Sequence, residues 1–179
     1  MNVQKMIFRH NSAGGPCSGK STGQAHIVDY GQMLGFNVLA CPEAATMAFA
    51  SGIQRDGYLQ ENILEMQLGH ELVFSAAAER FVKTTQKPVL ITYDRGLLDG
   101  FAYVDDPREF EKLLTARNIS RAAILESRYD VTTHLVTAAN GASEFYTNDN
   151  NPYREEGLKE AIFRDKKLQE ANNGAKNYE

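Results

Sequence analysis

Residues 14–22 restrict the possible folds of this chain more than any other part of its sequence. They read Gly-Gly-Pro-Cys-Ser-Gly-Lys-Ser-Thr, so a glycine is followed, after four residues, by Gly-Lys-Ser at the point where a helical pattern begins. Glycines let the backbone turn successive N–H groups toward one centre, and the start of a helix adds further unpaired N–H groups. Such a loop forms a nest for anions, and this spacing is typical of loops that bind the phosphates of a nucleoside triphosphate.

Each residue of this segment has an expected role in binding a triphosphate. Lys20 would reach the β- and γ-phosphates, Ser21 would offer its hydroxyl to Mg²⁺, and Thr22 would lie near the α-phosphate. The backbone expected to surround the phosphates belongs to Gly14, Gly15, Pro16, Cys17, Ser18 and Gly19. The alternative interpretation is a glycine-rich turn before an ordinary helix.

Apolar periodicity in the rest of the chain predicts alternating strands and helices. Strands are expected at residues 6–8, 36–40, 88–93 and 131–136. Helices are expected at residues 20–34, 43–49, 58–84, 107–116, 120–127 and about 154–171. This alternation predicts an α/β protein with three αβα layers, in which right-handed crossovers join a parallel sheet of about four to five strands.

Two segments of this pattern, the first strand and the longest helix, carry further predictions. The first strand, at residues 6–8, runs into the polar residues 9–12, although central parallel strands are usually apolar. Either this strand is shifted or the approach to the loop is longer than usual. In the helix at 58–84, the apolar residues, including Leu72 and Val73, mostly recur at spacings of three and four, which predicts that they face the core.

Composition limits the size of the protein and its partners. A chain of 179 residues predicts a single domain over residues 1–179. The polar and charged segment after the fourth strand predicts a lid around residues 140–165. The net charge of −4 disfavours nucleic-acid binding, which usually needs a basic surface. No apolar stretch approaches the ~20 residues that cross a bilayer, so we expect no membrane span and a cytoplasmic location. The two cysteines, Cys17 and Cys41, form neither a metal nor a disulfide framework.

Polar residues follow the predicted strands at the edge of the sheet where ligands of parallel sheets bind. Asp94 follows the strand at 88–93 and could support Mg²⁺ together with Ser21, the alternative being a turn residue. Arg95 could clamp an acceptor or a phosphate, or form an ion pair with a nearby glutamate. Glu43 follows the second strand and could accept a proton from a substrate hydroxyl or orient it, or could serve as a first-turn acid of the next helix.

A charged segment after the fourth strand contains Arg154 and Arg164. A mobile arm that carries an arginine over the γ-phosphate would suit phosphoryl transfer, and we expect at least one of the two, Arg154 in the first place, to reach the nucleotide. A solvated amphipathic helix explains the same residues.

Four blocks of sequence together resemble the AAA-type domain family that includes the nicotinamide riboside kinase domain and the TRPL translocation defect protein. The blocks are residues 14–22, Pro-Glu-Ala-Ala-Thr at 42–46, Tyr-Asp-Arg-Gly-Leu-Leu-Asp-Gly at 93–100, and residues 134–146 with Glu-Phe-Tyr at their end. The resemblance implies a fold closer to small nucleoside and nucleotide kinases than to ring-forming motors. It also implies nucleotide at residues 14–22, magnesium at Ser21 and Asp94, and an acceptor pocket near Glu43 and Arg95.

Members of this family differ in what they do with the nucleotide. Some phosphorylate a small nucleoside-like acceptor, while others resemble GTP-binding proteins joined to a phosphate- or lipid-recognising domain. Relatives usually continue into a final strand and helix that help to hold the base, so the choice between ATP and GTP stays open and a four-stranded sheet with one exposed edge is predicted. The sequence favours a kinase that transfers a γ-phosphoryl group with Mg²⁺ to an unknown small molecule. The alternatives are a nucleotide-dependent switch with slow hydrolysis and a degenerate domain that only binds phosphate.

Overall fold

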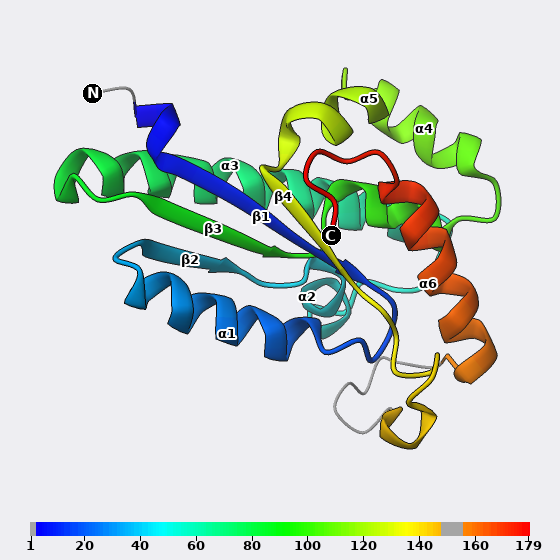
Figure 1. Cartoon of the computed structure of the whole chain (residues 1–179). Coiled ribbons are helices and arrows are strands. Elements are labelled where there is room, and N and C mark those ends of the chain that lie inside the picture. Colours follow the sequence, from blue (N-terminus) through cyan, green and yellow to red (C-terminus); the bar gives the residue numbers. More distant parts are fainter. Residues whose placement is uncertain (1–2, 148–155) are drawn as a thin grey trace.

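A computed structural model describes residues 3–147 and 156–179, and its centre is a sheet of four parallel strands (Figure 1). The strand order is β2-β3-β1-β4. The strands are β1 (Ile7–Gly14), β2 (Asn37–Cys41), β3 (Val89–Asp94) and β4 (Val131–Leu135). The parallel order confirms the predicted α/β class and the number of strands.

Helices cover both faces of this sheet. They are α1 (Lys20–Met33), α2 (Ala44–Ala50), α3 (Leu59–Thr85), α4 (Pro107–Thr115), α5 (Arg121–Ala123) and α6 (Leu158–Asn172). Shorter turns are η1 (Val3–Met6), η2 (Leu97–Tyr103), η3 (Ile124–Arg128) and η4 (Ser143–Phe145). Figure 1 shows α1 on one side of the sheet and α3 on the other, which gives the predicted three layers.

Packing explains these two layers. Gly31 of α1 lies so close to Val38 and Leu90 that an added Cβ would come within 2.9 Å of the Val38 side chain. On the opposite face, α3 buries Leu64 and Val82 against the apolar residues of β3. A glycine thus lets α1 approach the β2–β3 half of the sheet, and the larger core lies under α3.

The strand β1 is longer than predicted and extends through the polar residues to the phosphate loop. It spans Ile7–Gly14 rather than residues 6–8. His10 is buried, and its two ring nitrogens are hydrogen-bonded to the hydroxyls of Thr92 and Thr133, at 3.0 and 3.2 Å. Burial lowers the His10 pKa to about 4, so the ring is neutral at pH 7. The prediction was wrong because the neighbouring strands supply polar partners that an apolar pattern does not reveal.

The inward face of α3 also differs from the prediction. Leu72 and Val73 were expected to face the core, but they are 73% and 60% exposed. Residues 64, 71, 75, 78 and 82 follow the three- and four-residue spacing of the inward side, and this stripe includes the polar Glu71 and Ser75. The helix therefore presents polar groups to the sheet at this turn, and the apolar residues beside them point outward.

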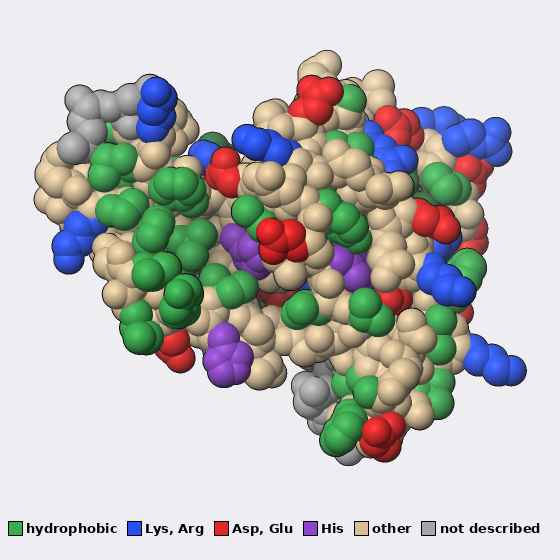
Figure 2. Space-filling view, in the orientation of Figure 1, with side chains coloured by type: hydrophobic (Ala, Val, Ile, Leu, Met, Phe, Trp, Pro, Cys, Tyr) green, Lys and Arg blue, Asp and Glu red, His purple; other side chains and the backbone are tan. Residues whose placement is uncertain are grey.

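One edge of the sheet is partly covered. The backbone of residues 177–179 pairs with β4, with Glu179 N–H donating to the Thr132 carbonyl (3.0 Å) and His134 N–H donating to the Glu179 carbonyl (2.7 Å). The edge predicted to be exposed is therefore occupied over this short stretch. Apolar surface gathers elsewhere, over the end of α1 and the start of β1 (Figure 2), where Tyr30, Met33 and Phe8 are exposed. Within the described residues, no helix is both long and apolar enough to cross a membrane.

Candidate active site

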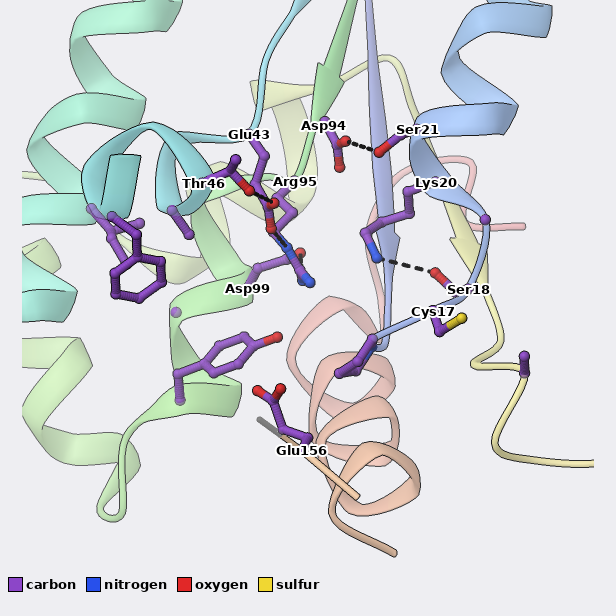
Figure 3. Close-up of a pocket in the computed structure, with 18 of the residues that line it drawn as sticks. Cys17, Ser18, Lys20, Ser21, Glu43, Thr46, Asp94, Arg95, Asp99 and Glu156 are labelled. Carbon is purple, nitrogen blue, oxygen red and sulfur yellow. Dashed lines mark hydrogen bonds and ion pairs between the residues drawn. The ribbon is translucent and has the colours of Figure 1, made fainter. Parts of the chain in front are cut away.

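A cavity of about 870 Å³ lies at the carboxyl ends of β1, β2 and β3 (Figure 3). One side is lined by the phosphate loop, from Pro16 to Thr22. The other side is lined by Glu43, Arg95 and the residues around them. The structure therefore brings the predicted phosphate-binding segment and the predicted acceptor residues to one cavity.

The phosphate loop has the backbone of an anion nest. Gly14, Cys17 and Gly19 have positive φ angles of 142°, 55° and 81°. Lys20 bends back into the loop, where its Nζ donates to the carbonyls of Gly14 (2.9 Å) and Gly15 (2.8 Å). Burial, reinforced by the charge of Arg95, lowers the Lys20 pKa to about 7. The lysine thus uses the loop's own carbonyls as partners.

Asp94 and Ser21 face each other beside the loop. Ser21 Oγ donates to Asp94 Oδ2 at 3.1 Å, while Asp94 Oδ1 is buried and has no hydrogen-bond partner among the described residues. Burial raises the Asp94 pKa, as does Glu43, while Lys20 and Arg95 oppose them. An unpaired carboxylate oxygen next to a serine hydroxyl fits Mg²⁺, which takes few protein ligands and keeps several waters. The described residues hold no group of three His, Cys, Asp or Glu side chains that would by itself bind a metal.

Glu43, Arg95 and Asp99 form a buried ionic cluster, which we call the acidic clamp. Arg95 Nε donates to Glu43 Oε1 at 2.5 Å, and Arg95 Nη1 donates to Asp99 Oδ2 at 3.3 Å. Thr46 Oγ1 donates to the other Glu43 oxygen at 2.5 Å. Burial alone would raise the pKa of Glu43. The charge of Arg95, the hydrogen bonds from Thr46 and Arg95, and the charge of Lys20 together outweigh burial and lower this pKa to about 2. Glu43 is therefore an ionised carboxylate with its charge balanced by Arg95.

This cluster bears on two alternatives left open by the sequence. Glu43 stands at the N-cap position of α2, but its side chain makes no capping hydrogen bond and turns toward Arg95 instead. Arg95 does form an ion pair with a glutamate, although this pair is largely buried in the cavity wall rather than at the surface. In Figure 3 the charged ends of Arg95, Asp99 and Lys20 converge on the same space.

Sequence reasoning did not assign a role to Asp99 or Thr46. Asp99 lies four residues after Arg95, and Thr46 three residues after Glu43, which are the spacings at which side chains meet on one helical turn. Tyr103 was also missed. Its ring lies beneath two guanidinium groups, those of Arg95 at 5.6 Å and Arg164 at 5.3 Å.

The helix α6 is attached directly to the phosphate loop. Asp165 is buried, and its Oδ1 accepts the backbone N–H of Gly15 at 2.8 Å and lies 3.0 Å from Nε2 of His134. Arg164 donates to the Ala102 carbonyl of η2 and pairs with Glu160, and its guanidinium lies over the ring of Tyr103, which lines the cavity. Arg154 lies outside the described residues. A lid around residues 140–165 stays a prediction, and its described end, at the start of α6, belongs to a helix packed on η2.

Gly15→Ala is expected to destabilise the fold by about 1–3 kcal/mol, because a Cβ there overpacks the contact with α6. That atom would lie 2.8 Å from both Cβ and Oδ1 of Asp165. Gly69→Ala is the matched control, since nothing lies within 4 Å of an added Cβ in the middle of α3. It should stabilise the protein by about 0.5–1 kcal/mol. Urea unfolding of both variants measures these changes, and equal midpoints would contradict the close approach of α6.

The first strand leads through a glycine-rich anion nest into a helix, and an aspartate from the neighbouring strand lies opposite Ser21. This arrangement defines a phosphate-loop nucleotide-binding protein. The structure is similar to that of thymidylate kinase from Ehrlichia chaffeensis, with a TM-score of 0.59 over 97% of this chain and 92% of that chain. The sequence identity is 15%, so this likeness concerns the kinase-like fold alone. The family described as "AAA domain" matches residues 9–178, and the chain belongs to this family. A search of curated proteins returned no significant match.

Proposed function

We propose that this protein is a kinase that transfers the γ-phosphoryl group of ATP or GTP, with Mg²⁺, to a hydroxyl group of a small nucleoside-like acceptor. The observation that carries the proposal is the single cavity that joins the phosphate loop to the acidic clamp. A site that only held nucleotide would not need buried charged groups on the side of the cavity opposite the phosphate loop. Phosphoryl transfer needs such an arrangement, because it depends on positioning and on charge more than on covalent chemistry.

The acceptor side of the cavity supports a nucleoside-like substrate. Phe49, Leu59 and Ile63 give it apolar walls, and Gln60 and Gln67 add amide groups. Apolar walls with a few convergent polar groups are typical of sites that bind a planar ring and read its hydrogen-bonding edges.

On the phosphate side, the proposed reaction begins when a triphosphate takes over the partners of Lys20. The lysine would exchange the carbonyls of Gly14 and Gly15 for the β- and γ-phosphates. Ser21 and Asp94 would hold Mg²⁺, which when bound offsets the negative charge of the phosphates. Arg154 remains the proposed lid arginine.

On the acceptor side, the roles of Glu43 and Arg95 follow from their ionisation. Because its pKa is about 2, Glu43 is a weak base that would accept a hydrogen bond from the acceptor hydroxyl and orient it. Transition states of phosphoryl transfer are largely loose, so little more is required of this group. Arg95 would fix Glu43 and carry positive charge beside the transferred group.

The test is a turnover assay with Mg²⁺, ATP or GTP, and a panel of nucleosides, in which mass spectrometry detects phosphorylated products. We expect product with at least one acceptor, saturation with acceptor concentration, and loss of product in Lys20→Ala. Slow hydrolysis that no acceptor accelerates would contradict the kinase.

That outcome would favour the second candidate, a nucleotide-dependent switch with slow hydrolysis. One observation supports it: Gly15 of the loop is hydrogen-bonded to Asp165, so a change in the loop on binding triphosphate would be felt by α6. For a switch, protease protection of α6 should differ between the triphosphate-bound and diphosphate-bound protein.

Triphosphate affinity is expected to fall as the pH rises above about 7. Lys20 has a pKa of about 7 in the free protein, and bound phosphates would restore its positive charge, so binding above this pH must take up a proton. The apparent affinity should fall by up to about tenfold per pH unit above that pKa. Calorimetry at pH 8 in buffers of different ionisation enthalpy measures the uptake, and Lys20→Arg, which stays charged, is the control. Identical heats in all buffers for the unmodified protein would show that binding takes up no proton, and this would contradict the prediction.

A further inference from the structure

A second cavity lies on the α3 side of the sheet, and none of the described residues lines both it and the candidate active site. Its volume is about 590 Å³, within the range of small-molecule sites. The floor comes from β1 and β3, and the walls come from α3 and residues 119–128. The two polar residues on the inward side of α3, Glu71 and Ser75, line this cavity.

The floor carries two polar groups without partners. The Arg9 guanidinium makes no hydrogen bond or ion pair with any described residue. The hydrogen bond between Arg9 and Asp130 is made by the backbone N–H of Arg9 and does not involve its side chain. Tyr93 is 3% exposed, and its hydroxyl has no hydrogen-bond partner in the described chain. Ser75 lies near this hydroxyl but completes no hydrogen bond of normal geometry with it. Buried hydroxyls are nearly always hydrogen-bonded, so the pair calls for a further group in this space.

The acidic residue of the wall is already neutralised. Both oxygens of Glu71 are engaged, one by Arg128 Nη2 at 2.5 Å and the other by the Tyr129 hydroxyl at 2.6 Å. Asp130 lies near Arg9 but does not line the cavity. Among the lining residues, two arginines therefore face one glutamate, and the Arg9 guanidinium has no ion-pair partner among them.

The rest of the wall is apolar. Leu68, Ile119 and Ile124 line it, and Leu72 lies at its exposed side. We propose that this cavity binds a small monoanion with an apolar body, such as a medium-chain or aromatic carboxylate. Its carboxylate meets Arg9 and the Tyr93 hydroxyl, and its body lies between Leu72 and Ile119. Charge-assisted bonds from a guanidinium and a hydroxyl select the anion, and the apolar wall excludes small hydrophilic ions.

The test compares octanoate with octan-1-ol, which share a chain length and differ in charge. A ¹H–¹⁵N NMR titration of the whole chain should show saturable binding of octanoate at least tenfold tighter than that of octan-1-ol, with the largest shifts at residues lining the second cavity. Arg9→Gln should abolish the preference for octanoate. Arg108→Gln, which removes an exposed arginine paired with Asp106, should preserve it.

Tyr93→Phe keeps the proposal testable if Arg9→Gln does not fold. It removes an unpaired hydroxyl, so the melting temperature should be kept or raised, while octanoate affinity falls about threefold to tenfold. Equal affinities for the two probes, an unchanged preference in Arg9→Gln, unchanged affinity in Tyr93→Phe, or shifts confined to the phosphate loop would each overturn the proposal.

Discussion

Lys20→Ala is expected to weaken triphosphate binding by at least about 100-fold, or about 2.7 kcal/mol, without destabilising the fold. The substitution removes the cation that would face the β- and γ-phosphates. It also removes a buried ammonium, and this removal raises the stability of the folded protein. The Lys20 pKa of about 7 means that burial opposes the charged form of the lysine. The alanine variant should therefore melt at the same temperature as the unmodified protein, or slightly above it.

Calorimetry with a non-hydrolysable triphosphate and a thermal melt measure the two parts of this result. Lys159→Ala, which removes an exposed lysine of α6, is the control and should change neither. If affinity were unaltered in Lys20→Ala, residues 14–22 would not be the phosphate site. If both affinity and melting temperature collapsed, the lysine would be structural.

Arg95→Met is expected to lower the free energy of unfolding by about 3–5 kcal/mol, because it removes the main counter-charge of two buried carboxylates. Glu43 and Asp99 would keep the cost of burial and lose the arginine that offsets it. For a protein of this size, the melting temperature should fall by roughly 6–20 °C. Phosphorylation of any acceptor should be lost as well.

The pH dependence of this variant has a defined sign. Without Arg95, burial raises the pKa of Glu43 and Asp99 above their values in the unfolded chain, so protonation stabilises the folded state. The variant should thus be less destabilised at pH 5 than at pH 8, by urea unfolding at both. Adding Glu43→Gln and Asp99→Asn should restore much of the lost stability. Arg108→Met breaks an exposed pair and should change stability by less than about 1 kcal/mol. If the Arg95→Met protein were as stable as this control, Arg95 would not stabilise the acidic clamp.

The parts of the protein that could be predicted are those where local chemistry fixes the residue type. A phosphate loop favours glycine at most of its positive φ angles, here Gly14 and Gly19, and needs a lysine at the start of the helix, so residues 14–22 could be identified without a structure. Asp94 and Glu43 could be located because they follow apolar strands and the ends of parallel strands meet at one edge.

The parts that could not be predicted depend on partners far away in the chain. The polar residues of β1 are acceptable in a central strand because Thr92 and Thr133 meet His10 from both sides. The inward position of Glu71 is acceptable because Arg128 and Tyr129 surround it. The link between Asp165 and Gly15 joins residues 150 positions apart, and no local pattern announces it.

That link also bears on the order in which a ribosome can build the site. The phosphate loop is synthesised well before α6, yet the carboxylate that holds its Gly15 N–H belongs to α6. Until α6 leaves the ribosome and docks, this N–H group and His134 lack their shared partner. Synthesis of the loop and completion of its hydrogen bonds are therefore separated in time, so the emerging chain should reach its full affinity for nucleotide only after α6 has been made and has docked.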